Sequence, residues 1–281
     1  MIDNTKRRIF LSHALHYSVC TIAALTAVPL FLIILKVFTS GIGGFSVAFF
    51  TESAPSAYKT MMGESGGIAS GIIGTLVMLL MASVVAIPIG ILAGTYMSEY
   101  KHNKLPAVIS FLTDLLQGTP SVILGIVIYA CIVVPTGGYS GFAGSIALGI
   151  MMLPLIIRST EEALNIVPPT LREASVALGA SFPTTVFRVL LPNAFGGVFT
   201  GILLAISRVI GETAPLMFTA LGCAAIRWDM TKPMSAVPLM IWEFWTDANL
   251  QDLVWSAALF LLLLVLTLNF LAKYIERKFT V

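Results

Sequence analysis

The sequence has 281 residues, of which 57% are hydrophobic and 11% are charged, and its mean hydropathy is +0.94. Soluble domains usually carry about 25% charged residues, so this composition excludes an ordinary soluble protein and indicates an integral membrane protein. The net charge of +2 says little, because the distribution of Lys and Arg matters more than their sum in a membrane protein. The three cysteines lie far apart in the sequence, so we expect neither a disulfide framework nor a metal site.

The N-terminal part of the chain predicts one membrane span and one external loop. Three basic residues precede a long run without formal charge, which is longer than a signal-peptide core, so we expect a retained span near residues 14–36. The mixed stretch at 39–67 contains charges, Ser, Gly and Pro, as is typical of a connection. We therefore divide the chain into residues 1–66, with this helix and loop, and residues 67–281, which form the core.

The core predicts five further spans. The 43 uncharged residues between Asp114 and Arg158 are enough for two of them, divided by a Pro-Thr-Gly-Gly turn signal. Together with the first span, this gives an all-α protein with six transmembrane helices. The five core spans are expected at residues 65–98, on either side of the turn at 135–138, around Arg208 and at 253–272.

Two prolines lie inside the expected third and fourth spans. Pro120 is near the start of the third, and Pro154 is near the end of the fourth. Because neighbouring helices in a bundle can satisfy the carbonyls that a proline frees, we expect bends at both residues rather than breaks.

The distribution of Lys and Arg predicts the orientation of the six spans. If both termini and the loops at 97–107 and 158–193 are cytoplasmic, eleven basic residues lie inside and three lie outside. This agrees with the positive-inside rule. We therefore expect a multi-pass membrane protein with both termini in the cytoplasm.

The most unusual charges are Arg208 and Glu212. Residues 193–207 and 213–226 are uncharged, but these runs of fifteen and fourteen residues are each shorter than the ~20 needed for a span. We therefore expect one crossing helix that contains both charges at mid-depth, paired at i and i+4, with a kink at Pro215. The pair is either a self-neutralising structural feature or, as we prefer, part of an anion pathway, since Arg binds oxyanions in a bidentate manner.

The predicted cytoplasmic stretch at 158–193 contains signals for a short helix. Thr170 and Glu173 have the spacing of a capping box, and Gly179 is placed for the left-handed residue that ends a helix. A helix lying on the membrane surface is one interpretation. We prefer a docking helix, because about two turns bury too little area to need such defined ends.

This stretch also resembles the permease subunits of bacterial ABC importers. Their loop has the pattern Glu-Ala-Ala, three residues, Gly, nine residues, Ile-x-Leu-Pro. Here Glu173-Ala174-Ser175, Gly179 and Val189-Leu190-Leu191-Pro192 match at the same spacings. The resemblance implies the six-helix type I (MetI-like) permease fold, and contact of Thr170, Glu173, Ala174 and Gly179 with a separate ATPase subunit. No phosphate-binding loop occurs in the chain, so we expect a transport subunit and not an enzyme.

Four further segments resemble the phosphate-importing members of this family: Gly67-Gly-Ile with Gly74-Thr75, residues 96–100, residues 118–125 and residues 208–216. The resemblance implies import of inorganic phosphate, driven by ATP hydrolysis on partner subunits. The implied partners are a second, related permease, two copies of an ATP-binding subunit and an external phosphate-binding protein, besides membrane lipid. No cofactor and no nucleic acid are expected.

Three alternatives remain open from the residues themselves. The chemistry of Arg208 does not distinguish phosphate from sulfate or molybdate. A secondary anion transporter also places charges at mid-depth, but it usually shows inverted repeats, and we find no clear duplication. A membrane enzyme would need convergent polar residues, whereas the three histidines, His13, His16 and His102, are scattered.

Overall fold

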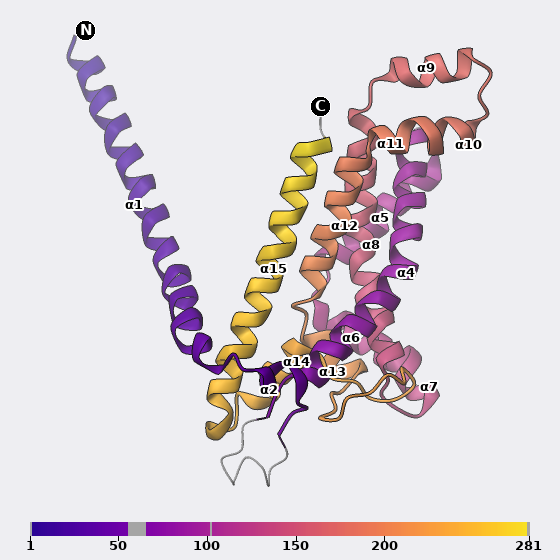
Figure 1. The fold of residues 1–281 in the computed structure, drawn as a ribbon. Helices are drawn as coiled ribbons and strands as arrows, with labels where there is room; N and C mark the ends of the chain where they lie inside the picture. Colours follow the sequence, from indigo (N-terminus) through magenta and orange to yellow (C-terminus); the bar gives the residue numbers. More distant parts are fainter. Residues whose placement is uncertain (1, 56–65, 102, 280–281) are drawn as a thin grey trace.

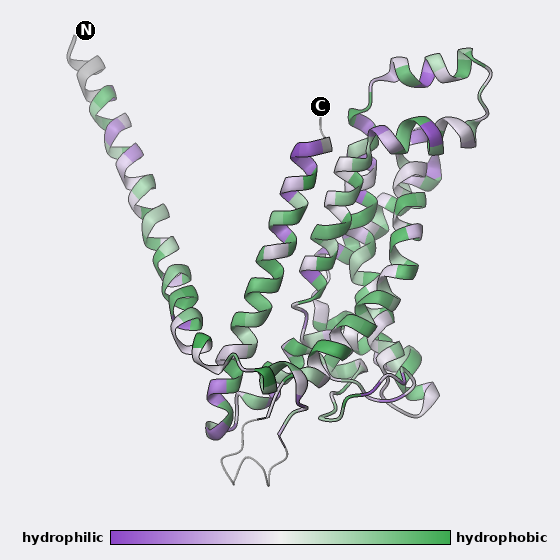
Figure 2. Ribbon diagram, in the orientation of Figure 1, coloured by the Kyte–Doolittle hydropathy of each residue, from purple (hydrophilic) through white to green (hydrophobic). Residues whose placement is uncertain are grey.

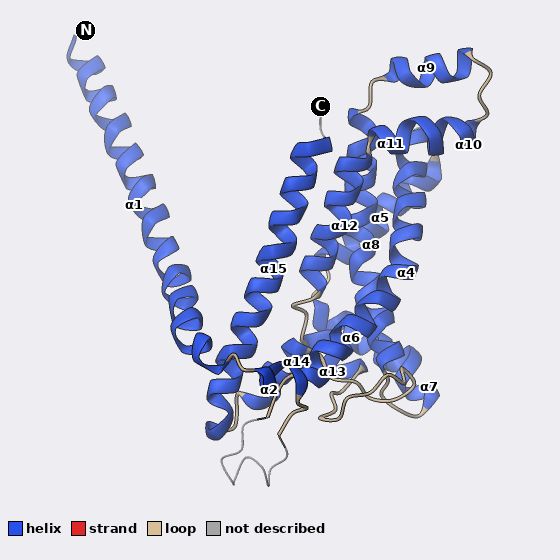
Figure 3. Cartoon of the chain, viewed as in Figure 1, coloured by secondary structure: helices blue, strands red, loops and turns tan. Residues whose placement is uncertain are grey.

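The computed structural model describes residues 2–55, 66–101 and 103–279 of the chain (Figure 1). Part of the predicted external loop, residues 56–65, lies outside the described residues. The described part is helical, and its only β-type pairing is an isolated bridge between Leu221 and Met234 (Figure 3). The helices are α1 (Ile2–Gly41), α2 (Val47–Thr51), α4 (Ala69–Glu99), α5 (Lys104–Gly118), α6 (Ser121–Ile128), α7 (Val134–Thr136), α8 (Gly141–Ile166), α9 (Pro169–Ala177), α10 (Phe182–Thr185), α11 (Leu191–Asn193), α12 (Phe195–Val209), α13 (Ala214–Thr219), α14 (Val237–Phe244) and α15 (Gln251–Phe279).

The prediction of an all-α protein with six membrane spans is confirmed, but two of the spans are not straight. Within the described residues, four helices are long and apolar enough to cross a membrane alone: α1, α4, α8 and α15. The other two spans are bent pairs, with a bend of 106° after Gly118 and of 74° between Asn193 and Phe195. Apolar residues cover most of the long helices, and hydrophilic residues gather near their ends (Figure 2).

Helices α4 and α8 pack closely in the centre of the bundle. A Cβ atom added at Gly90 would lie 2.6 Å from Ile156 Cγ2, and one added at Gly94 would lie 2.5 Å from the Ile157 carbonyl oxygen. Glycine therefore permits the two backbones to approach, as is typical of membrane helix pairs. The fully buried side chains of Met78, Leu148, Met152 and Ile156 fill the interface on either side.

The first helix, α1, extends beyond the predicted span at 14–36 and leaves the bundle (Figure 1). It contacts α15 only near its C-terminal end, where Ser256 Oγ donates a hydrogen bond to the Gly41 carbonyl at 3.0 Å. Lys36 lies over the Trp255 ring at 5.5 Å from its centroid. Described side chains along the central part of α1 are exposed, so this helix has an apolar surface that the chain itself does not cover.

The two proline predictions have different outcomes. The α8 helix continues through Pro154, so a break is absent there as expected. At Pro120 the prediction of a bend without a break is wrong, because the helix stops at Gly118 and α6 starts in a new direction. Pro120 has no N–H to continue the helix, and it disfavours a helical conformation for Thr119.

The ends of two spans also differ from the prediction. Helix α5 begins at Lys104 and contains Asp114, which we had expected to precede the third span. Helix α8 continues past Arg158 to Ile166, so the start of the predicted loop at 158–193 is helical. The described ends of α1 and α15 nearest the termini lie on the same side of the bundle as α9 (Figure 1).

Candidate functional site

The fifth span is broken just before Glu212. Helix α12 ends at Val209, Glu212 lies in the connection that follows, and α13 begins at Ala214. The prediction of one helix containing Arg208 and Glu212 is therefore wrong. At 15 residues, α12 is ~22 Å long and shorter than the ~30 Å hydrocarbon core, so the break falls within membrane depth. Pro215 is in the first turn of α13, where its missing N–H costs nothing, and the predicted kink is thus a complete break.

The two charges consequently do not form an i, i+4 pair on a helix. Arg208 is exposed and Glu212 is half-buried, and neither side chain has a hydrogen bond or ion pair with another described residue. Arg208 lies in the last turn of α12, where a positive charge interacts favourably with the helix dipole. Because irregular backbone at membrane depth is tolerated only within protein or along a water-filled cavity, the break marks a surface that is not lipid-facing.

The broken ends of the third and fifth spans contact each other. Gly125 of α6 lies against Pro215 of α13: a Cβ atom added at Gly125 would lie 2.8 Å from Pro215 Cα. Both helices lie at the end of the bundle opposite α9 (Figure 1). The segments at 118–125 and 208–216, nearly 100 residues apart in sequence, therefore form one structural unit next to Arg208.

On the other side of the bundle, Pro169–Ala177 forms the short helix α9, whose start differs from the prediction. Its N-cap is Pro168, with no side-chain capping hydrogen bond, so the predicted capping box of Thr170 and Glu173 is wrong. Proline at the first helical position fixes the backbone in a helical conformation without a cap, which explains the earlier start.

The predicted end of α9 is confirmed. Gly179 has φ +77°, and the amides of Gly179 and Ala180 donate hydrogen bonds to the carbonyls of Val176 and Ser175 at 2.9 and 3.1 Å. This is a Schellman motif, which requires a left-handed residue at the position of Gly179. The helix therefore ends where the sequence predicts.

In the described part of the chain, the outward side chains of α9 are exposed. Leu178 is 89% exposed, and Thr170, Glu173 and Ala174 are also exposed. On its inner side, Ser175 is buried and its hydroxyl lies 2.9 Å from that of Thr185. The helix is held apart from the bundle (Figure 1), so the predicted docking residues are available to another protein.

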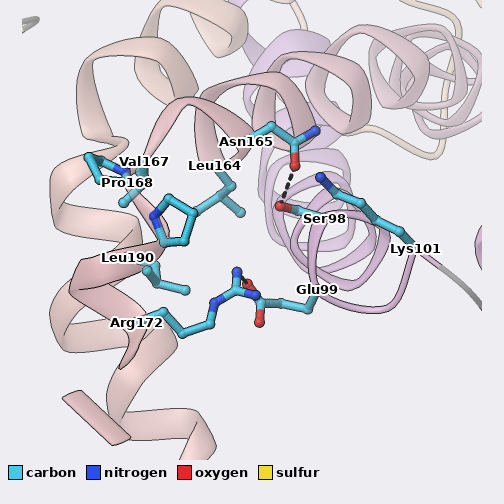
Figure 4. A pocket seen from close by; sticks show the side chains of 10 residues that line it. Ser98, Glu99, Lys101, Leu164, Asn165, Val167, Pro168, Arg172 and Leu190 are labelled. Atoms are coloured by element: carbon cyan, nitrogen blue, oxygen red, sulfur yellow. Dashed lines mark hydrogen bonds and ion pairs between the residues drawn. The ribbon is translucent and has the colours of Figure 1, made fainter. Parts of the chain in front are cut away.

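Beneath α9, a cavity of about 340 Å³ opens between this helix and the ends of α4 and α8 (Figure 4). The Arg172 guanidinium reaches across it to form an ion pair with Glu99, the last residue of α4. In the same region, Ser98 Oγ donates a hydrogen bond to Asn165 Oδ1 at 2.9 Å. These polar contacts connect the ends of three helices.

Comparison with known proteins identifies the family. Residues 86–281 match the model of the family described as binding-protein-dependent transport system inner membrane component. The chain belongs to this family. The permease is 39% identical over 244 residues to the phosphate transport system permease protein PstA of Pasteurella multocida, covering 86% of this chain and 85% of that protein. It is also 39% identical to PstA of Yersinia pestis, covering 88% and 83%, and 38% identical to PstA of Mycobacterium leprae, covering 73% and 69%.

Solved structures agree with the fold of the permease. Two inward-facing structures of the MetNI methionine ABC transporter match it with a TM-score of 0.60 and 22% or 21% sequence identity. The matches cover 75% and 81% of this chain, and 94% and 100% of the respective chains. The expected MetI-like permease fold is thus confirmed.

Two ion-pair groups of the permease were missed by sequence reasoning. Arg158 contacts Asp114 Oδ1 at 2.6 Å, Glu161 Oε2 at 3.1 Å and Ser110 Oγ at 2.6 Å, which fixes α8 to α5. One signal in the sequence could have found the first group. Asp114 and Arg158 stand at the two ends of a charge-free run that holds two spans, and two consecutive spans bring the chain back to the same side of the membrane. The pair of Arg172 and Glu99 gave no such signal.

Proposed function

We propose that this permease is a transmembrane subunit of an ABC importer that moves inorganic phosphate into the cytoplasm. The observation that supports this most strongly is the identity of 36–39% to several PstA proteins over most of the chain. The contact between Gly125 and Pro215 adds to it, because it joins two segments on which the resemblance to phosphate permeases rests. ATP hydrolysis takes place on separate subunits.

Arg208 is proposed to contact the anion on its way through the membrane. Its guanidinium is exposed at a broken span and has no partner among the described residues, so it is available to a tetrahedral oxyanion. Glu212 follows in the same connection and limits how tightly the anion is held. Weak, oriented binding suits a pathway, because tight capture belongs to the external binding protein.

Helix α9 is proposed to be the coupling helix, and its outward surface is proposed to dock on the ATPase subunit. Thr170, Glu173 and Ala174 are exposed on a helix that projects from the bundle, and Gly179 sets the direction of the chain after it. Exposed apolar residues such as Leu178 would be covered by the partner.

The complete importer is proposed to contain a second permease (PstC-like), two copies of an ATP-binding subunit (PstB-like) and an external or periplasmic phosphate-binding protein (PstS-like). The complex would reside in the bacterial inner membrane with both termini of this chain in the cytoplasm. The described ends of α1 and α15 nearest the termini lie on the same side of the bundle as α9 (Figure 1), which is consistent with that orientation.

The proposal is tested with the four kinds of subunit reconstituted in vesicles. We expect ATP-dependent uptake of labelled phosphate that excess sulfate and molybdate do not inhibit. Arg208→Lys is expected to reduce uptake tenfold or more, since losing a bidentate contact of about 1.4 kcal/mol has that effect. Arg277→Lys, at an exposed arginine in the last turn of α15, is the matched control and is expected to transport normally.

Two further variants separate a pathway from a structural role. Glu212→Gln should alter the rate of uptake while the complex still assembles. Replacement of Arg208 and Glu212 together by apolar residues should abolish uptake, again without loss of assembly. Normal transport by this double variant would refute the role in the pathway, and uptake of sulfate or molybdate in place of phosphate would refute the substrate.

A further inference from the structure

The contact between Arg172 and Glu99 is the one charged link between α9 and the membrane helices in the described part of the chain (Figure 4). The Glu99 side chain is only 5% exposed, whereas that of Arg172 is 42% exposed. Leaving a buried carboxylate without its partner costs free energy, so separation of Arg172 from Glu99 is unfavourable. Arg172 therefore keeps α9 tied to the end of α4.

The other attachments of α9 do not lead to α4. The helix is joined through Val167 and Pro168 to α8, and Ser175 contacts Thr185 in the segment that follows α9. Tyr100 and Phe182 make an aromatic contact at 5.8 Å between the end of α4 and α10, but neither residue belongs to α9. Among the described residues, the ion pair of Arg172 and Glu99 is thus the one polar contact that joins α9 directly to α4.

Helix α4 continues from this contact to the opposite side of the bundle. It has 31 residues and is therefore ~46 Å long, which is more than the thickness of the hydrocarbon core. Near its other end, the Val237 amide donates a hydrogen bond to Thr75 Oγ1 at 3.0 Å. A Cβ atom added at Gly74 would lie 2.0 Å from the Ser235 carbonyl oxygen, so the segment before α14 packs directly on α4.

We propose that the ion pair of Arg172 and Glu99 is the joint through which movement of the coupling helix is passed to α4, and through α4 to the external segment at 234–244. Arg172 and Glu99 are positioning residues, since neither is placed to contact the substrate. This inference rests on the proposed function, because it assumes that α9 moves with an ATPase subunit. It adds to that function the residues that connect docking to the membrane pathway.

The test uses the reconstituted complex with Arg172→Gln, with Glu99→Gln and with the charge swap Arg172→Glu/Glu99→Arg. Lys101→Gln is the matched control, because Lys101 lines the same cavity but has no ion pair with a described residue. Three quantities are measured: the amount of ATPase subunit that co-purifies, the stimulation of ATP hydrolysis by the phosphate-loaded binding protein, and the phosphate imported per ATP hydrolysed.

Both single variants are expected to retain the ATPase subunits, because the docking surface of α9 faces away from α4. In both variants, the stimulation of ATP hydrolysis by the phosphate-loaded binding protein should fall roughly fivefold or more, and so should the phosphate imported per ATP. A factor of about five is the lower end of the coupling usually found between two sites. The charge swap should restore most of both quantities, and Lys101→Gln should match the wild type.

Two results would overturn the proposal that this ion pair transmits movement. Single variants that remain as well coupled as Lys101→Gln would show that the ion pair transmits nothing. Loss of the ATPase subunits in all three variants, including the charge swap, would show that the pair only stabilises the fold. Failure of the proposed function is separate: a wild-type complex that imports another oxyanion would reject phosphate, and the same variants would then be compared with that anion.

Discussion

Gly125 in α6 has no room for a Cβ atom, because Pro215 of α13 lies against it with its Cα atom 2.8 Å from where that Cβ would be. The atoms concerned belong to the backbone, so a flexible side chain cannot move aside. The contact fixes the bend of the third span relative to the break in the fifth, and thereby the position of the end of α12 that carries Arg208.

The first prediction is that Gly125→Ala separates these two helices. Overpacking of this kind costs about 1–3 kcal/mol. We expect a lower melting temperature of the purified complex and a marked loss of uptake. Gly118→Ala is the control, since a Cβ atom there would have nothing within 4 Å. Equal effects of the two variants would contradict a specific role for the contact with Pro215.

The second prediction concerns Gly179, whose φ of +77° is in the left-handed region. A β-branched residue is disfavoured there by roughly 1–2 kcal/mol, so Gly179→Val should misdirect the chain after α9. Binding of the ATPase subunit and uptake should fall, while the amount of permease in the membrane stays unchanged. Gly179→Asn should be much milder, because Asn adopts this conformation more readily. A Val variant that binds its ATPase normally would show that the turn is not needed for docking.

The third prediction concerns Glu173, which is exposed and does not cap α9. Because no capping bond is lost, Glu173→Gln and Glu173→Ala should both change stability by less than about 0.5 kcal/mol. If the ATPase subunit recognises the carboxylate, both variants should weaken its binding to a similar degree, as measured by titration of the purified subunits. A large loss of thermal stability in Glu173→Ala but not in Glu173→Gln would instead indicate that Glu173 caps α9.

The fourth prediction concerns Glu243 of α14, whose carboxylate lies against Gly222. Burial raises the pKa of Glu243 above its usual value. A raised pKa means that the folded state binds this proton more tightly than the unfolded state. The resulting stabilisation is present below the unfolded pKa and is lost as the pH rises through the folded pKa.

Glu243→Gln should therefore raise the melting temperature of the complex most at alkaline pH, because ionisation of the poorly solvated Glu243 carboxylate costs stability. The difference between the two proteins should shrink as the pH falls through the raised pKa of Glu243. Glu52→Gln, at an exposed carboxylate, is the control and should show no such trend. A constant difference between wild type and Glu243→Gln at every pH would exclude titration of Glu243 as its cause.

Local composition and residue spacing were enough to predict several properties of this protein. Long charge-free runs predicted a helical membrane protein with six spans, because backbone groups in lipid must be satisfied within helices. The position of Gly179 predicted the end of α9, because a left-handed residue is a local requirement. The motif from Glu173 to Pro192 indicated the family because all of its residues lie within one short segment of the sequence.

The breaks in the spans and the pairing of the charged residues depend instead on contacts between distant parts of the chain. Counting residues placed Arg208 and Glu212 on one helix, but packing of α13 against α6 allows the chain to break between them. Asp114 pairs with Arg158 from 44 residues away and Glu99 pairs with Arg172 from 73 residues away, and no local pattern specifies such distant pairs. Hydropathy counts how much chain can cross a membrane, whereas the direction of each segment depends on which distant backbone it packs against.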